Sequence, residues 1–172
     1  MDFVKTSSRV QPADIERLIA EYGNSILRMC FVYLQDRALA EDAMQETFVK
    51  VYRQYASFRH ESSEKTWIMR IAINTCKDVR RSAWFRRVDR SVTLDQLPEP
   101  HTECDPADDT LILEIMKLPP KLKEVILLRY YQDLSFQEIA AALQIPVGTV
   151  STRMNTARKR LRQKLEGWYF DA

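Results

Sequence analysis

The last third of the chain contains two helical patterns of apolar residues with a proline and a glycine between them. In the first pattern, Ile139, Ala140 and Leu143 share one helical face. In the second, apolar residues recur at spacings of three and four, namely Val150, Met154, Ala157, Leu161 and Leu165. We expect Pro146 and Gly148 to end the first helix and restart the chain in a new direction. These features predict a helix-turn-helix.

The chemistry of both predicted helices fits this motif. Ser135 and Glu138 form a capping-box pattern at the start of the first helix. On the second helix, Thr152, Asn155, Thr156 and Lys159 lie opposite the apolar stripe, and Ser151 and Arg153 flank it. Asparagine can bond adenine, threonine can meet the thymine methyl, and the cations suit phosphates. A surface helix of a bundle is the alternative, but the helix pair with its cap and turn favours DNA binding.

The N-terminal half predicts three long helices. Pro12 suits a first helical position, Asp36 can cap a second helix that runs to about Tyr55, and Ser62 or Ser63 can cap a third. Ile19 and Tyr52 are among the residues expected to face inward. The sequence contains no alternating strand pattern and only three glycines. We therefore expect an all-α protein with a helical bundle at its N-terminus.

Charge divides the chain into three parts. Residues 1–90 carry 16 Lys/Arg and 12 Asp/Glu, residues 91–114 carry none and 7, and residues 115–172 carry 10 and 5. Residues 91–109 contain three prolines and no cation, which predicts a flexible acidic linker. Such a segment can mimic nucleic acid in a basic channel or act as a solvated spacer, and composition leaves both readings open.

Two features of the N-terminal half suggest binding. The expected exposed face of the second helix is acidic, with Glu41, Asp42, Gln45 and Glu46. It is either a docking surface for a basic partner or a solvated face, and the residues alone do not decide. Residues 57–67 form a polar loop with aromatic and cationic side chains, and Asn74, Lys77, Arg80 and Arg81 follow. Aromatic rings and cations together are what a single strand of DNA needs, although the Trp67 ring also suits a core.

Other function classes find no support. No stretch of eighteen apolar residues and no signal-peptide core is present. Cys30 and Cys76 lie on apolar faces and Cys104 in a loop, which favours reduced thiols in a cytoplasmic protein. We find no nucleophile triad, phosphate loop or metal-ligand spacing, and His60 is a single loop histidine. We therefore expect no enzyme activity, catalytic residue, metal, cofactor or small-molecule substrate.

Three segments in order resemble the bacterial sigma-70 family, specifically the small extracytoplasmic-function (ECF, group IV) sigma factors. AEDAMQETFVKVY is similar to the segment that binds the polymerase beta-prime clamp, and TWIMRIAINTCKDVRRS to the segment that melts and holds the minus-10 element. LPPKLKEVILLRYYQDLSFQEIAAALQIPVGTVSTRMNTARKRL is similar to the domain that reads the minus-35 element. The resemblance covers about residues 14–168. It implies a sigma-2 domain at 1–90, a linker at 91–109 and a sigma-4 domain at 110–172.

The resemblance also implies partners and site residues. It assigns Asp42, Gln45 and Glu46 to core RNA polymerase, whose beta-prime clamp and beta flap are the expected contacts. It assigns to the minus-10 element Phe58, Arg59, His60, Ser63, Lys65, Trp67, Asn74, Lys77, Arg80 and Arg81. It assigns to the minus-35 element Thr149, Ser151, Thr152, Arg153, Asn155, Thr156 and Lys159. Ser151 and Thr156 stand where many members carry a basic residue, which suggests heavier reliance on Thr152 and Asn155.

Regulation is the last implication. The resemblance implies an anti-sigma protein, often membrane-anchored, that holds the factor until a stress or envelope signal releases it. The alternative is a two-domain helix-turn-helix regulator that binds duplex DNA as a dimer. The acidic face and the basic loop argue against that alternative.

Overall fold

The computed structural model describes residues 11–82 and 106–170, and for 106–109 and 166–170 it describes the backbone alone. These residues are helical and contain no strand, which confirms the all-α class. The elements are α1 (Pro12–Leu34), α2 (Arg37–Gln54), η1 (Tyr55–Ser57), α3 (Glu64–Arg81), α4 (Pro106–Lys117), α5 (Pro120–Ile126), η4 (Leu127–Tyr131), α6 (Phe136–Leu143) and α7 (Val147–Phe170). The predicted linker lies outside the described residues up to position 105, and α4 begins at Pro106, within its last residues.

Side-chain caps set the helix starts, because a helix leaves its first N–H groups without partners inside the helix. The Leu39 amide donates to Asp36 Oδ1 at 2.9 Å. The Thr66 amide donates to Ser63 Oγ at 3.1 Å, so Ser63 rather than Ser62 caps α3. Both bonds of the predicted capping box form between Ser135 and Glu138, at 2.8 and 3.2 Å.

In the N-terminal domain, α1 packs against α2 and α3. Its fully buried side chains include Leu18, Ile26, Met29, Phe31, Ile68, Met69 and Ile73. Cys30 and Cys76 are buried as expected, with their sulfur atoms 3.3 Å apart. The expectation that Ile19 and Tyr52 face inward was wrong, because these side chains are 44% and 54% exposed. Both residues lie near the edge of an apolar stripe, where helical periodicity does not determine whether a side chain points inward or outward.

In the C-terminal domain, α5 and α6 pack against α7. Val150, Met154, Ala157 and Leu161 are buried and Leu165 is partly exposed, which confirms the predicted apolar face over its first four residues. The turn differs from expectation at one point. The chain leaves α6 through Gln144, whose φ of 54° is left-handed, whereas Gly148 lies inside α7 and does not break it.

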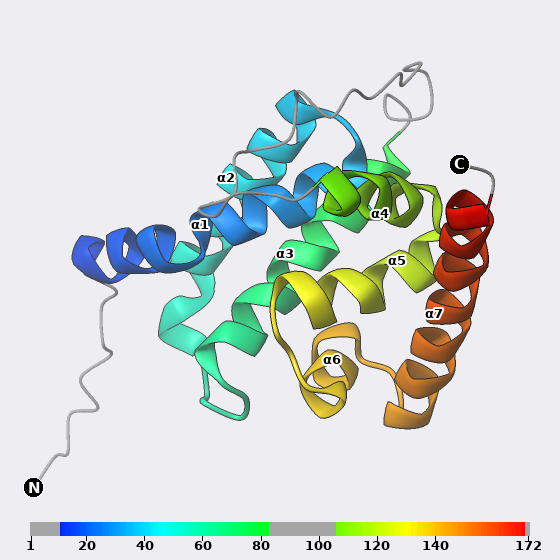
Figure 1. Cartoon of the computed structure of the whole chain (residues 1–172). Helices are drawn as coiled ribbons and strands as arrows, with labels where there is room; N and C mark the ends of the chain where they lie inside the picture. Colours follow the sequence, from blue (N-terminus) through cyan, green and yellow to red (C-terminus); the bar gives the residue numbers. More distant parts are fainter. Residues whose placement is uncertain (1–10, 83–105, 171–172) are drawn as a thin grey trace, which may run out of the picture.

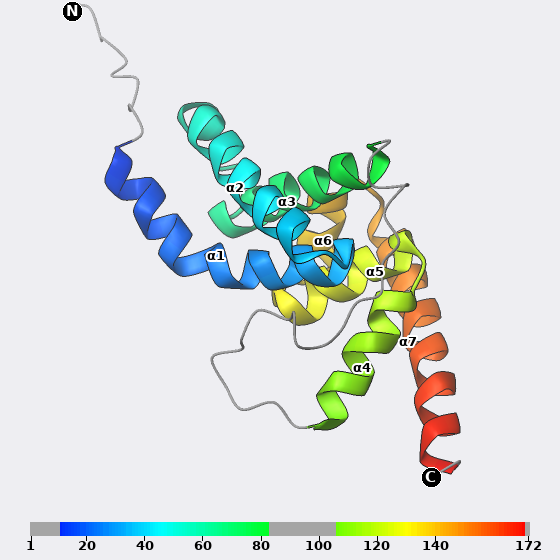
Figure 2. The same cartoon turned by 90° about the horizontal axis from the view of Figure 1, so that it is seen from above.

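The two domains lie against each other. Figures 1 and 2 show α3 between α1 and α6, and α7 on the side away from α1 and α2. The Gln132 side chain is buried and donates to the Ser25 carbonyl at 2.9 Å. The Gln35 side-chain amide donates to the Met116 carbonyl at 2.6 Å. Among the described residues, no helix is both long and apolar enough to cross a membrane.

Candidate nucleic-acid and polymerase interface

The loop between η1 and α3 carries a cluster of aromatic rings. The Phe58 ring stacks on Trp67 with centroids 4.8 Å apart and an interplanar angle of 29°, and it contacts the His60 ring at 4.4 Å. Trp67 is half-buried against the core, which agrees with the interpretation of its ring as a core residue. His60 and Arg59 are exposed. The loop therefore presents a built aromatic platform with a cation beside it. Such a platform can stack an unpaired base.

Helix α3 continues this surface with polar and cationic side chains. Asn74, Arg80 and Arg81 are exposed, and Lys65 is partly exposed. Arg81 pairs with Asp78 of the same helix at 3.5 Å, whereas the Lys77 Nζ forms an ion pair with Glu124 Oε2 of α5 at 3.3 Å. This contact crosses from one domain to the other, and neither the periodicity nor the charge of α3 predicted it.

Two carboxylates of the C-terminal domain thus face α3. Glu124 is 5% exposed and accepts a hydrogen bond from the Tyr33 hydroxyl at 3.2 Å as well as the Lys77 ion pair. Glu138 Oε1 accepts from the Thr66 hydroxyl at 3.4 Å. The neighbouring Lys123 is also buried, and burial together with the charge of Arg80 lowers its pKa to about 8. Two acidic groups of the C-terminal domain therefore lie against α3.

Cations of both domains meet in one groove of about 490 Å³. From α3 it is lined by Lys77, Arg80 and Arg81, and from the C-terminal domain by Lys121 and Arg153. Glu124 also lines it and is paired with Lys77. The residues predicted for the minus-10 and minus-35 elements are therefore brought together at this point.

On α7, the predicted recognition surface is open to solvent. Thr152, Asn155, Thr156 and Lys159 are exposed, and Thr149, Ser151 and Arg153 are partly exposed. The hydroxyls of Thr152 and Thr156 each donate to the carbonyl four residues earlier, at 3.0 and 2.9 Å. Their donors are thus occupied, and their methyl groups and oxygen lone pairs remain for a ligand. The Asn155 side chain is exposed on the same face, and an amide can bond adenine through two hydrogen bonds.

The acidic face lies on α2, on the N-terminal domain. Asp42, Gln45 and Glu46 are exposed, and the only close ion pair of Glu46 among the described contacts is a 3.9 Å approach to Lys50. Val49 and Tyr52 follow at helical spacing and are 40% and 54% exposed. Sequence reasoning missed these two apolar residues as part of the face. Val49 lies three residues after Glu46, and Tyr52 lies three residues after Val49. This helical spacing from the acidic residues would have predicted that both belong to the same face.

Comparison with known families identifies the chain. The sigma-70 region 2 model matches residues 18–86, and the sigma-70 region 4 model matches residues 109–161. The chain belongs to the sigma-70 family of RNA polymerase sigma factors. As a member of its ECF group, it binds core RNA polymerase and directs initiation of transcription at promoters.

Relatives and solved structures agree with this identification. This sigma factor is 33% identical to RNA polymerase sigma-H factor of Pseudomonas aeruginosa, over 92% of this chain and 91% of that protein. It is 34% identical to ECF RNA polymerase sigma factor SigW of Bacillus subtilis, over 84% of each. Its fold is similar to sigma factor RpoE of Bartonella quintana in complex with the anti-sigma factor NepR, with a TM-score of 0.75, 22% identity, and coverage of 89% and 97%. It is also similar to CnrH in complex with the cytosolic domain of CnrY, with a TM-score of 0.71, 22% identity, and coverage of 94% and 93%.

Proposed function

We propose that this sigma factor holds the non-template strand of the minus-10 element with the loop at Phe58–Ser63 and with helix α3. The observation that carries this assignment is the aromatic stack of Phe58, Trp67 and His60 beside Arg59. Lys65 and Asn74 complete the base-facing set, and Ser63 borders it with its hydroxyl engaged at the start of α3. Lys77, Arg80 and Arg81 hold the phosphates, because a cation on the strand backbone adds affinity without sequence information.

The acidic face of α2 is the proposed contact with core polymerase. Asp42, Gln45 and Glu46 supply charge for a basic helix of the beta-prime clamp. Val49 and Tyr52 add exposed apolar area next to that charge, which is the mixture typical of a protein interface. Both kinds of residue lie on one helix, so a single partner helix can engage them together.

The outer face of α7 is the proposed reader of the minus-35 duplex. Asn155, Thr152 and Thr156 face the base edges, and Thr149, Ser151, Arg153 and Lys159 lie at the phosphates. Three cations that follow on the same helix, Arg158, Arg160 and Arg162, are exposed and add sequence-independent affinity.

Simultaneous use of both DNA surfaces requires the two domains to separate. The promoter positions minus-35 and minus-10 are about 25 base pairs apart, which is roughly 85 Å at 3.4 Å per base pair. In this structure Arg80 and Arg153 line the same groove. We therefore propose that the packed arrangement belongs to the free factor and that it opens when the factor joins polymerase and promoter.

The proposed regulator is a membrane-anchored anti-sigma protein that holds the factor on the cytoplasmic side. The fold similarity to a sigma factor solved in complex with an anti-sigma factor supports this proposal. An inhibitor that binds both domains would favour the packed arrangement and keep α3 covered.

The proposal can be tested with the purified factor, core polymerase and labelled single strands of the minus-10 element. We expect the holoenzyme to bind a matched strand in preference to strands with one base changed. The triple variant Lys77→Ala, Arg80→Ala and Arg81→Ala should bind all strands more weakly with a flatter salt dependence. A holoenzyme that binds every strand equally would overturn the assignment of the loop.

A further inference from the structure

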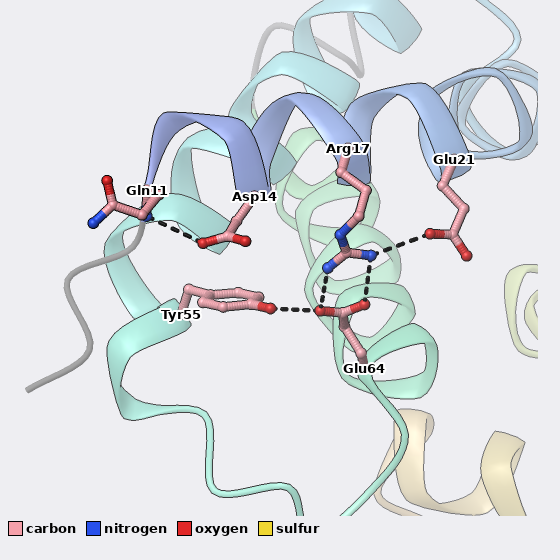
Figure 3. Close-up of polar contacts among 6 residues, drawn as sticks. All are labelled: Gln11, Asp14, Arg17, Glu21, Tyr55 and Glu64. Atoms are coloured by element: carbon pink, nitrogen blue, oxygen red, sulfur yellow. Dashed lines mark hydrogen bonds and ion pairs between the residues drawn. The ribbon is translucent and has the colours of Figure 1, made fainter.

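Three helix ends meet beside the minus-10 loop, and one carboxylate joins them. Glu64, the first residue of α3, accepts from both terminal nitrogens of Arg17 on α1, at 3.2 and 2.9 Å. It also accepts from the hydroxyl of Tyr55, the first residue of η1, at 2.6 Å (Figure 3). The geometry is the bidentate fork that arginine and carboxylate form best. We call Arg17, Tyr55 and Glu64 the loop clamp.

The charges of the clamp are matched. The Arg17 guanidinium is the main reason that the pKa of Glu64 is lowered, and the Tyr55 hydroxyl adds to the effect. The pKa of Tyr55 is raised because its hydroxyl donates to that carboxylate. Glu64 is therefore ionised and Tyr55 protonated at neutral pH, which is the state in which all three hydrogen bonds form.

The clamp closes the loop at both ends. Tyr55 stands just before the segment Phe58–Ser63, and Glu64 stands just after it. The Tyr55 ring also contacts the rings of Phe58 and Trp67, with centroids 6.3 and 6.0 Å away. Tyr55 thus contacts the aromatic rings with its own ring and bonds Glu64, at the far end of the loop, with its hydroxyl.

The loop itself needs such support. His60 holds a left-handed φ of 56°, which costs free energy in a residue with a β-carbon. The Arg59, His60 and Glu61 side chains are exposed, so core packing does not hold them in place. A loop whose ends are held loses less conformational freedom when a ligand binds.

We propose that Arg17, Glu64 and Tyr55 are positioning residues that set the base specificity of the minus-10 loop. This inference rests on the proposed function of that loop. The clamp does not touch the strand. It acts by holding the Phe58–Trp67 stack and the left-handed turn at His60 in the geometry that accepts one base and rejects the others.

The sharpest variant is Tyr55→Phe, which keeps the ring contacts and removes only the hydroxyl. We expect the holoenzyme with this variant to lose roughly three- to tenfold in its ratio of affinities for matched and single-base-changed minus-10 strands, as loss of preorganisation predicts. Glu64→Gln should have a similar effect, because an amide holds Arg17 less tightly. Arg17→Lys should recover part of what Arg17→Ala loses, since lysine restores the charge without the fork.

Tyr130→Phe is the matched control. Tyr130 also has a hydroxyl bonded to an arginine, Arg158, at 3.0 Å, but on the C-terminal domain. On single strands without a minus-35 element, this variant should discriminate as the wild type does. The salt slope of Tyr55→Phe should match that of the wild type. Its thermal unfolding midpoint should fall only by the modest amount that the loss of one hydrogen bond explains, and a fall in stability alone would weaken binding to all strands alike rather than change their ratio.

The outcomes separate the two proposals. If the wild-type holoenzyme does not discriminate between the strands, the proposed function of the loop fails. If the wild type discriminates and Tyr55→Phe discriminates equally well, the clamp has no positioning role. If Tyr55→Phe loses stability and affinity for all strands in the same proportion, the clamp is structural and the inference is overturned.

Discussion

Removal of the Glu124 carboxylate should open the molecule. Glu124 lies on α5 and is bonded to two residues of the other domain, Tyr33 at 3.2 Å and Lys77 at 3.3 Å. In the variant Glu124→Ala both contacts disappear, whereas in a separated molecule Glu124 is solvated and its loss costs little. The substitution therefore acts mainly on the equilibrium between packed and separated domains.

The magnitude follows from burial. The bond from a buried tyrosine hydroxyl to a carboxylate is worth about 1.5 kcal/mol. The Lys77 side chain is 21% exposed, so its ion pair is partly screened and contributes about 1 kcal/mol. Together they are worth about 2–3 kcal/mol, which corresponds to a shift of roughly 30- to 150-fold toward the separated state.

Single-molecule energy transfer between dyes on the two domains measures this shift. Exposed positions suit the dyes, for example Ala38→Cys on α2 and Gln163→Cys on α7, with Cys104→Ser to remove a third site. Cys30 and Cys76 are buried and should not react. Glu114→Ala is the control, because its 2.6 Å ion pair with Lys117 lies within α4 and does not join the domains. Equal transfer distributions for Glu124→Ala and the wild type would refute the role of Glu124, and a wild type that is already separated would refute the packed arrangement.

Three further predictions concern other parts of the molecule. Burial lowers the pKa of Lys123 in the folded chain to about 8. Between pH about 8 and 10.5 the unfolded chain therefore binds more protons at Lys123 than the folded chain does, and this residue makes the free energy of unfolding rise with pH. Thermal unfolding of Lys123→Met should show a higher midpoint than wild type at pH 7 and a smaller rise over that window; an unchanged pH profile would contradict the burial of its charge. Glu46→Arg should weaken binding to core polymerase without moving the unfolding midpoint, because surface changes alter stability by no more than about 0.5 kcal/mol, and normal binding in a titration would remove α2 from the interface. Asn155→Ala should cost roughly 1–3 kcal/mol of discrimination at one minus-35 base pair, whereas Thr156→Lys should strengthen binding and steepen the salt slope by about one unit; mobility shifts across a salt series measure both, and a sequence-independent effect of Asn155→Ala would place the helix at another rotation.

Local features of the fold could be predicted from the sequence. The caps at Asp36, Ser63 and Ser135 follow from residue types that accept a hydrogen bond from a helix N-terminus. The buried face of α7 follows from its spacing of apolar residues. These features depend on neighbours within four positions along the chain, which a single sequence contains.

Contacts between distant segments could not be predicted. Nothing in the residues near Lys77 indicates Glu124, and nothing near Arg17 indicates Glu64, 47 positions later. No pattern around Gln132 predicts burial, yet this residue is 1% exposed and bonds Ser25 of the other domain. Polar residues of this kind are buried only when a partner satisfies them, and that partner is set by tertiary packing.

Transcription from a defined template tests the central claim most directly. The purified factor is mixed with core polymerase, nucleotides and a template that carries a matched promoter, and the transcripts are measured. We predict a one-to-one complex with core polymerase and transcripts that start at one position, only when the factor is present and both promoter elements are intact. A chain that binds the duplex alone as a dimer and leaves core polymerase without activity at that promoter would contradict the account.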